Sequence, residues 1–199
     1  MQLHNLFPTA VGMFDLGRDF TEQEKSFALG LPQHANMGNS TSDDWEVLTR
    51  PEMADLKKFC EDAVAEYLKS IYAPKNDVRM RVTQSWCNYT KPGQFHHKHE
   101  HPNSFISGVL YLQSDSLTDR IYFYKPGYQQ IKMPTDNWNV YNSESWWFEA
   151  MQGRLILFPS HLTHMVETVR GDDTRISLSF NTFPVGHVGD DHTLTGLYL

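Results

Sequence analysis

Histidine is concentrated in one short segment of this chain, HHKHEHP, which begins at His96. Four of the ten histidines stand in it. Residues i and i+2 of an extended segment point the same way, so His99 and His101, or His97 and His99, could present two imidazoles to one metal ion. A pH-sensitive patch or an ordinary solvated loop would explain the same cluster, and one such pair does not decide between them.

A more distant histidine strengthens the metal interpretation. His164 lies in LILFPSHLTHMVETV, near the start of a predicted strand and far from the cluster along the chain. Jelly-roll folds bring such distant strands side by side. Two close histidines and one distant histidine are a common ligand set for an open metal site, so the cluster and His164 together predict one.

Arg175 is the next residue whose position suggests chemistry. In RISLSFN, strand alternation places Arg175, Ser177, Ser179 and Asn181 on one face. A sheet with one solvated face would account for this pattern. If the polar face lines a barrel instead, Arg175 needs an anionic partner, because an unpaired buried charge is costly. A bound carboxylate, held by the guanidinium with help from Ser177, would meet that need.

The elements that must position these residues are mainly strands. Alternating or short apolar runs, separated by Gly, Pro, Asn and Asp, predict strands at residues 78–89, 105–113, 120–125, 154–159, 164–169 and 175–183. One or two further strands are expected within residues 3–16, and residues 31–48 read as a loop. Many short strands of this kind predict a mainly β fold, a sandwich or jelly roll.

The predicted helices precede these strands. Two segments, TEQE and TRPE, have the spacing of a capping box, in which a Thr and a Glu three residues later bond to each other's backbone N–H groups. A first helix should follow TEQE and end near Gly30, and a second should run from about Pro51 to Tyr72. Its apolar residues share one helical face, which we expect to pack on the outer face of the sheet. The inward residues should include Leu56, Phe59, Tyr67 and Leu68.

Composition sets the remaining limits. The 199 residues, 40% apolar and 21% charged, predict one globular domain over residues 1–199. A net charge of -7 argues against a broad nucleic-acid-binding surface. The two cysteines form no disulfide framework and suggest a reducing, cytoplasmic setting. No apolar run is long enough for a membrane span, and the first residues do not read as a signal peptide.

Three motifs, taken together, resemble one known family. HEHPNSFISGVLY at 99–111, RLILFPSHLTH at 154–164 and RISLSFN at 175–181 are similar to motifs of the iron(II)- and 2-oxoglutarate-dependent oxygenases. Within that superfamily the chain most resembles a prolyl-hydroxylase-like group found in bacteria and phages. The resemblance covers roughly the whole chain. It implies a double-stranded β-helix (jelly roll) with N-terminal helices on its outer face, iron(II) as the metal cofactor and 2-oxoglutarate as the cosubstrate.

The resemblance also implies roles for individual residues. His99 would be the first iron ligand and His164 the distal one. Arg175 would bind the distal carboxylate of 2-oxoglutarate, with Ser177 beside it. Activity would be that of a dioxygenase, which oxidises and usually hydroxylates an unknown substrate while releasing succinate and carbon dioxide.

Other side chains could lie around the same cavity. Tyr89 and Tyr111 resemble tyrosines that contact the cosubstrate in related enzymes, although core packing on barrel strands would explain both equally well. Trp86 and Asn88 could line the cavity. An aromatic wall at its mouth, or ordinary packing, would account for Trp138, Trp146 and Trp147.

One position departs from the family pattern. The usual H-x-D/E motif reads His99-Glu100-His101 here. Glu100 is not a simple replacement, because adjacent residues of an extended segment face opposite ways. His101 could be the third ligand, the site could use two histidines and an open position as in halogen-transferring relatives, or the metal could differ from iron. We predict that His101 completes the site. His96 and His97 would then support the ligands, lie at the rim of the site, or simply be solvated.

Two other functions stay open from the residues alone. A three-histidine zinc enzyme would activate water as carbonic anhydrase does, but that chemistry gives no role to an inward Arg175. A non-catalytic, metal-binding jelly-roll module would account for the missing carboxylate ligand.

Overall fold

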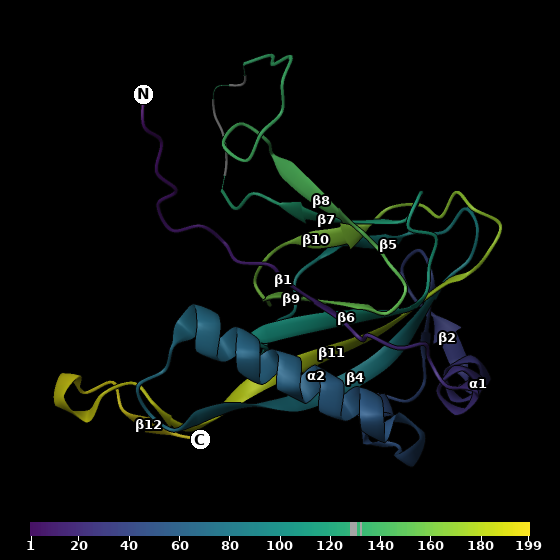
Figure 1. Ribbon diagram of the computed structural model, residues 1–199, viewed down its shortest axis with the longest axis horizontal. Helices are drawn as coiled ribbons and strands as arrows, with labels where there is room; N and C mark the ends of the chain where they lie inside the picture. The colour runs from purple at the N-terminus through teal and green to yellow at the C-terminus, as the bar shows by residue number, and fades with distance from the viewer. Residues whose placement is uncertain (128–130, 132) are drawn as a thin grey trace.

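Two antiparallel sheets make up most of the molecule, as the computed structural model shows for residues 1–127, 131 and 133–199 (Figure 1). The order of strands in the larger sheet is β1 (Gly12–Asp15), β9 (Arg154–Pro159), β6 (Ile106–Gln113), β11 (Arg175–Val188), β4 (Val78–Thr90), β3 (Ser40–Ser42) and β2 (Gln33–Ala35), with β12 (Leu197–Tyr198) beside β11. The order in the smaller sheet is β5 (His96–His99), β10 (His164–Val166), β7 (Arg120–Tyr124) and β8 (Ser145–Glu149). The expected mainly β jelly roll is confirmed.

The two faces of β11 separate the molecule into two interiors. Its apolar residues, Ile176, Leu178 and Phe180, are buried against the helices. The opposite face points between the two sheets, where a second apolar cluster is buried. That cluster comprises Val109, Tyr111, Ile121, Phe123, Ala150, Ile156, Phe158, Leu162 and Val166. The polar face of β11 therefore lines the barrel, as the alternation of RISLSFN suggested.

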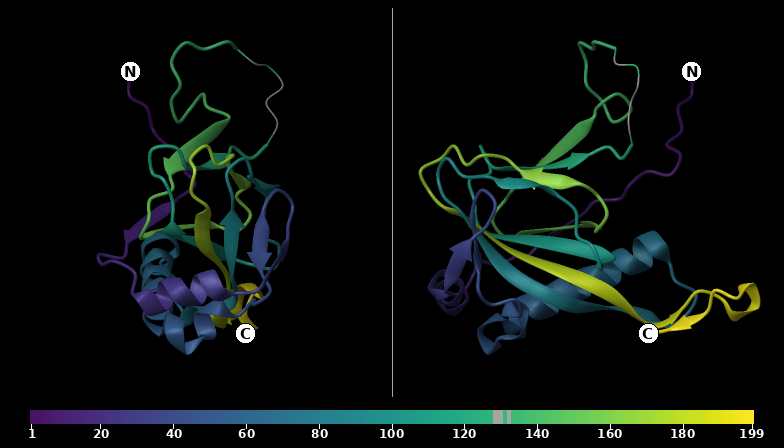
Figure 2. Two further views of the ribbon diagram at one scale, coloured as in Figure 1. Left: turned by 90° about the vertical axis from the view of Figure 1, so that its right-hand side faces the viewer. Right: turned by 180° about the vertical axis from the view of Figure 1, so that it is seen from behind.

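A long helical segment covers the outer face of the larger sheet (Figure 2). It runs without a break through η2 (Pro51–Met53), α2 (Ala54–Tyr67) and the π-helical turn η3 (Leu68–Tyr72). The side chains that it buries against the sheet lie on one face, as expected. They are Met53, Leu56, Cys60, Ala63, Val64, Tyr67 and Leu68, and Phe59 packs against the same cluster.

The start of this segment corrects one prediction. Thr49 does not cap it; its hydroxyl donates to the carbonyl of Glu46 within the preceding turn, η1 (Val47–Thr49). Arg50 is the N-cap instead, and its side chain makes no capping hydrogen bond. The reason is Pro51, which forces the residue before it into an extended conformation, so the helical turn begins one residue later than the TRPE spacing requires.

The first capping box is confirmed. The Thr21 hydroxyl accepts a hydrogen bond from the Glu24 N–H at 3.2 Å, and the Glu24 carboxylate accepts one from the Thr21 N–H at 2.8 Å. These bonds start α1 (Glu22–Gly30), which lies at the end of the barrel near β2 (Figure 2). The carboxylate of Glu24 is also bound by Arg18 at 2.6 Å, so this cap is an ion pair as well.

One strand, β1, forms within residues 3–16, in agreement with the expected one or two, and residues 1–9 are exposed. Two other local expectations need revision. The segment 31–48 contains the short hairpin of β2 and β3 rather than a plain loop. Strand β8 was missed, because SWWFE lacks period-two alternation and becomes a strand through its pairing with β7. Beyond β11 lies the single turn η4 (Asp191–Thr193). In the described part of the chain, no helix is long and apolar enough to span a membrane.

The buried helical face predicts a large effect for one substitution. Leu56 is completely buried, so Leu56→Ala should lower the free energy of unfolding by about 2–5 kcal/mol through lost burial and a residual cavity. Leu29→Ala on α1 is a matched control, because Leu29 is 59% exposed and should change the free energy by less than about 1 kcal/mol. Denaturant titration measures both, and equal effects would mean that α2 does not hold this face against the sheet.

Candidate metal centre

Three histidines converge at one end of the smaller sheet. His99 ends β5, His164 begins β10, and these two residues are direct partners in the antiparallel pairing. His101 lies just after β5, where its backbone N–H donates to the Ser160 carbonyl at 3.0 Å. One ring nitrogen from each histidine lies within 4.8 Å of the others, and the Nε2 atoms of His101 and His164 are 3.3 Å apart. The structure thus brings together the three residues that the sequence selected as ligands.

Backbone carbonyls orient two of these rings. Nδ1 of His99 lies 2.7 Å from the carbonyl oxygen of His97, and Nδ1 of His164 lies 3.0 Å from that of Leu162. A carbonyl can only accept a hydrogen bond, so each Nδ1 must carry the proton. Nε2 of each ring is then left with its lone pair, which is the arrangement of a histidine prepared to bind a metal ion.

Burial keeps the three imidazoles neutral. Burial, together with the smaller effect of the neighbouring His99, lowers the pKa of His101 to about 4. Burial, followed by the repulsion of His99 and His101, places the pKa of His164 well below its usual value. The pKa of His99 is lowered in the same direction, also mainly by burial. Neutral imidazole is the metal-binding form, so the site needs no deprotonation near pH 7.

Glu100 points away from these rings. Its carboxylate accepts a hydrogen bond from the Thr163 hydroxyl on the exposed side of the segment. This is the opposite-facing geometry expected of the residue between His99 and His101. Apolar rings form the other wall of the site: the ring of Phe158 lies 4.6 Å from that of His164, and Phe123 lies 6.0 Å away.

Arg175 has a partner that the sequence did not reveal. Its side chain is buried, and Nη1 donates to the carboxylate of Asp119 at 2.9 Å and to the carbonyl of Glu167 at 3.2 Å. Arg175 therefore faces the interior and has the anionic partner that such a position requires, but Asp119 of the chain itself supplies it. Asp119 stands just before β7, far from Arg175 along the chain, and no local pattern connects the two. Nη2 of Arg175, however, has no hydrogen-bond partner among the described residues.

A second unpaired donor lies nearby. Tyr111 on β6 is completely buried, and no residue that the structure describes bonds to its hydroxyl. Burial raises the pKa of this phenol, although the positive charge of Arg175 acts in the opposite direction. Ser177 is paired with Tyr111 on one side and with Asn88 on the other, and paired residues share a face of the sheet. Arg175, Ser177, Tyr111 and Asn88 therefore face the same interior.

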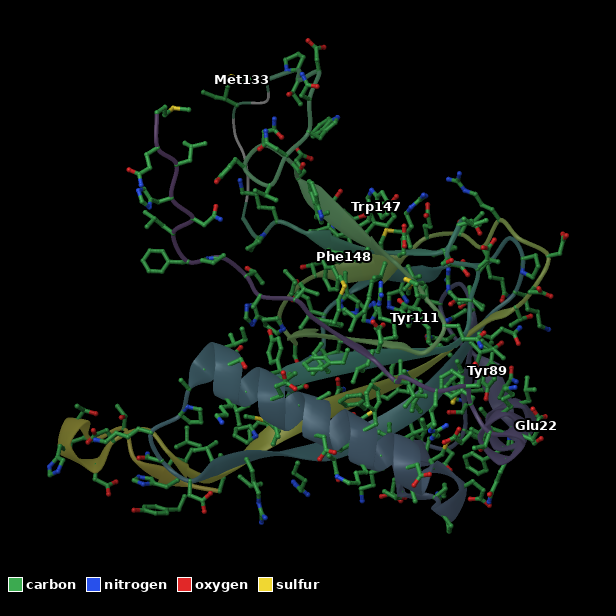
Figure 3. All side chains as sticks on the ribbon, in the orientation of Figure 1. Glu22, Tyr89, Tyr111, Met133, Trp147 and Phe148 are labelled. Carbon is green, nitrogen blue, oxygen red and sulfur yellow. The ribbon has the colours of Figure 1, made fainter. Side chains whose placement is uncertain are left out.

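Tyr89 is not part of this interior. It neighbours Asn88 on β4, so it points to the opposite face, where its hydroxyl donates to the carbonyl of Ala28 in α1. Figure 3 shows Tyr111 between the two sheets and Tyr89 on the side of α1. Both faces of β4 are covered, one by helices and one by the barrel, so its sequence pattern did not show which face Tyr89 would take. The proposed contact of Tyr89 with a cosubstrate is withdrawn.

Of the other residues expected around the cavity, Trp86 and Asn88 lie near it, and three tryptophans lie at the exposed strand β8 or before it. Trp86 does approach the histidines, since its ring lies 5.9 Å from that of His101. Asn88 lies inside the barrel and donates to the Ser179 hydroxyl at 3.0 Å, while its carbonyl oxygen has no partner in the described structure. The three tryptophans of the expected aromatic wall belong to β8 or to the connection before it and are 42–65% exposed; they are Trp138, Trp146 and Trp147.

The comparisons with known proteins agree with this geometry. Residues 84–181 match the model of a family described as "Putative 2OG-Fe(II) oxygenase", a span that reaches from β4 to β11 and includes all three histidines. No curated protein matches the chain. The resemblance expected from the sequence motifs is confirmed by the family match.

Several solved structures have a similar fold. A prolyl-4-hydroxylase from Pseudomonas putida shares 14% identity at a TM-score of 0.55, over 87% of this chain and 92% of that one. HygX from Streptomyces hygroscopicus, solved with nickel, 2-oxoglutarate and hygromycin B, shares 9% identity at a TM-score of 0.58, over 87% and 82%. A 2OG-Fe(II) oxygenase family protein from Burkholderia pseudomallei shares 13% at 0.56, over 79% and 74%. At these identities the likeness concerns the fold alone.

The geometry predicts which residue completes a metal site. His101→Ala should weaken iron(II) binding by more than about 100-fold, because it removes a ligand, whereas Glu100→Ala should weaken it by less than about 10-fold. An anaerobic titration against a competing chelator measures both, with the exposed His161→Ala as the control for loss of a histidine. Loss of iron in the Glu100 variant with retention in the His101 variant would mean that a carboxylate binds the metal. Retention in both would indicate a two-histidine site.

Proposed function

We propose, from the family match over residues 84–181 and the geometry of the site, that the chain is an iron(II)- and 2-oxoglutarate-dependent dioxygenase. It would oxidise, and most simply hydroxylate, an organic substrate while 2-oxoglutarate is converted to succinate and carbon dioxide. Bound iron(II), 2-oxoglutarate and oxygen would supply the oxidising chemistry. The side chains of the protein would bind, orient and shield these groups.

The donor set fits such a metal. His99, His101 and His164 offer three neutral imidazoles from one side, and imidazole suits iron(II) as well as other first-row metals. The backbone bonds to His99 and His164 fix both rings before any ion binds. Phe158 and Phe123 would keep water from one side of the ion.

One observation carries the cosubstrate assignment, the pair of buried donors without partners. Nη2 of Arg175 and the hydroxyl of Tyr111 are donors that a carboxylate would satisfy, with Ser177 beside them. Arg175 donates to the carbonyl of Glu167, which lies three residues beyond His164 and directly follows β10. That separation along a strand is about 10 Å, so a dicarboxylate could bind the metal at one end and these donors at the other. Water activation by zinc, or a site without chemistry, leaves both donors without a role.

With Asp119, the charges of the metal, the cosubstrate and Arg175 would sum to zero. Three neutral ligands leave the metal with its double positive charge, which the 2-oxoglutarate dianion would balance, and Asp119 balances Arg175. In the usual H-x-D/E pattern a carboxylate bound to the metal would play that part. We infer that the negative charge missing at His101 is supplied at Asp119, on the cosubstrate side of the same barrel.

The unpaired donors predict two effects on cosubstrate binding. Arg175→Met should weaken 2-oxoglutarate binding by on the order of 2–5 kcal/mol, and metal affinity should change far less. Tyr111→Phe should weaken 2-oxoglutarate binding by about 10-fold, yet leave the unfolding free energy equal or higher, since it removes a buried hydroxyl without a partner. Calorimetry on the anaerobic iron(II) protein and the visible band of a chelated keto acid measure the binding.

Arg175→Met leaves Asp119 buried without its partner and could therefore fail to fold. Tyr111→Phe removes no such partner, so it tests the same binding site in a folded protein. Arg170→Met is the matched control, since the Arg170 side chain is 70% exposed. Unchanged cosubstrate affinity in both Arg175→Met and Tyr111→Phe would sink the assignment.

Charge balance predicts a coupling between two distant positions. His101→Asp adds a negative charge beside the metal that nothing offsets, so it should weaken 2-oxoglutarate binding. His101→Asp should weaken 2-oxoglutarate binding less when Asp119 is already replaced by Asn. A double-mutant cycle on the binding free energy should then give a coupling of about 0.5–3 kcal/mol. Asp115→Asn, at an exposed residue of the same turn, should show no coupling with His101→Asp. Additive effects of His101→Asp and Asp119→Asn on 2-oxoglutarate binding would contradict the charge argument.

A further inference from the structure

His99, His101 and His164 form the inner site. Two further histidines, His96 and His97, form a second group of possible ligands together with His99. His96, His97 and His99, the outer group, each offer one ring nitrogen, and these nitrogens also lie within 4.8 Å of one another. The rings of His96 and His99 are stacked at 4.6 Å with an angle of 17°, and His97 lies 4.8 Å from His99. Three imidazoles at such distances can hold a divalent transition-metal ion.

An irregularity in the sheet explains why neighbours in sequence gather their rings. In a regular strand, His96 and His97 would point to opposite faces. Here His99 pairs with His164 and His96 pairs with Val166, so β5 advances three residues where β10 advances two. The extra residue is a β-bulge, and it brings His96 to the same side as His99. Bulges of this kind often re-aim a side chain next to a functional site.

We propose that the outer group is a second metal position, an alternative to the inner site for the same ion. His99 belongs to both groups, and its Nδ1 is bonded to the carbonyl of His97. It therefore has one lone pair, on Nε2, to give to one ion at a time. An ion would bind first to His96, His97 and His99, and would then exchange His96 and His97 for His101 and His164 while His99 holds it.

The burial of the two groups sets the direction of this transfer. All three members of the outer group are partly exposed, whereas the inner site includes the buried His164. His97 lies at the protein surface, with Nδ1 3.3 Å from the carbonyl of the exposed Met37. The outer group is thus the side on which an ion arrives from water. This proposal rests on the proposed function in one respect: it takes the inner site, which shares His99, to be the final metal position.

Cobalt(II), followed by its visible absorption, is a suitable probe for the two positions. His101→Ala breaks the inner site and should still bind one cobalt ion per chain, more than about 100-fold more weakly than the wild type. Adding His97→Ala to it should weaken binding at least about another 10-fold, because the outer group then loses a ligand. Adding the exposed His161→Ala instead should have no effect. Loss of His99 should remove both positions.

Each alternative gives a different pattern. Residual binding in His101→Ala that His97→Ala leaves unchanged would come from the pair of His99 and His164, and it would overturn the outer position. No cobalt binding at all in His101→Ala would also overturn it. If His101→Ala binds cobalt like the wild type and His97→Ala removes it, the outer position stands, while the inner site of the proposed function fails.

The rate of metal uptake tests the transfer itself. In the otherwise unchanged protein, His97→Ala should slow cobalt uptake from a chelate by about 10-fold or more and alter the equilibrium affinity by less than about 3-fold, an effect within the range for residues that support a metal site. His97→Gln, which keeps an N–H that can reach the Met37 carbonyl, should be equally slow, and His161→Ala should be as fast as the wild type. An unchanged uptake rate in both His97 variants would overturn the role of the outer group in loading.

Discussion

The pairing of β11 with β4 on one side and β6 on the other is the constraint on which the rest of the molecule depends. Alternate residues of β11 point under the helices or into the barrel, and each paired residue must take the same face. Arg175 and Ser177 therefore draw Asn88 and Tyr111 inward, and Tyr89 is turned outward. A slip of one residue would place the Arg175 charge among apolar side chains beneath α2, so the apolar core and the polar interior hold the same register.

The barrel interior departs from the usual rule that buried polar groups are paired. Nη2 of Arg175, the hydroxyl of Tyr111 and the carbonyl oxygen of Asn88 lack partners within the described residues. Each such group costs about 1–3 kcal/mol of stability. The apolar core under α2, with Leu56, Cys60 and Leu178 fully buried, offsets that cost on the opposite face of the same sheet. Unpaired groups gathered on one long, well-supported sheet are what a binding site for a polar molecule requires.

The metal ligands are supported differently from the cosubstrate residues. β5 and β10 are short strands of the smaller sheet, and their pairing contains a bulge. The rings of His99 and His164 are oriented by carbonyls only two residues away, so each ligand is held by its own stretch of chain. This local support leaves the histidine-rich segment free to depart from regular alternation. It also explains how four other imidazoles can gather around His99 without disturbing the larger sheet, whose register depends on β11.

By itself the sequence determined the features that depend on near neighbours. Period-two alternation predicted most strands, helical spacing predicted the buried face of α2, and TEQE predicted a cap, because each pattern records contacts only a few residues apart. The sequence also selected three histidines that the structure brings close together, and an arginine, Arg175, that the structure buries. The tertiary structure alone decided their partners. Asp119 meets Arg175 only through the packing of the two sheets, the face of Tyr89 follows from the register of β4 with β11, and a bulge places His96 beside His99. Such relations join distant segments, so no local periodicity encodes them.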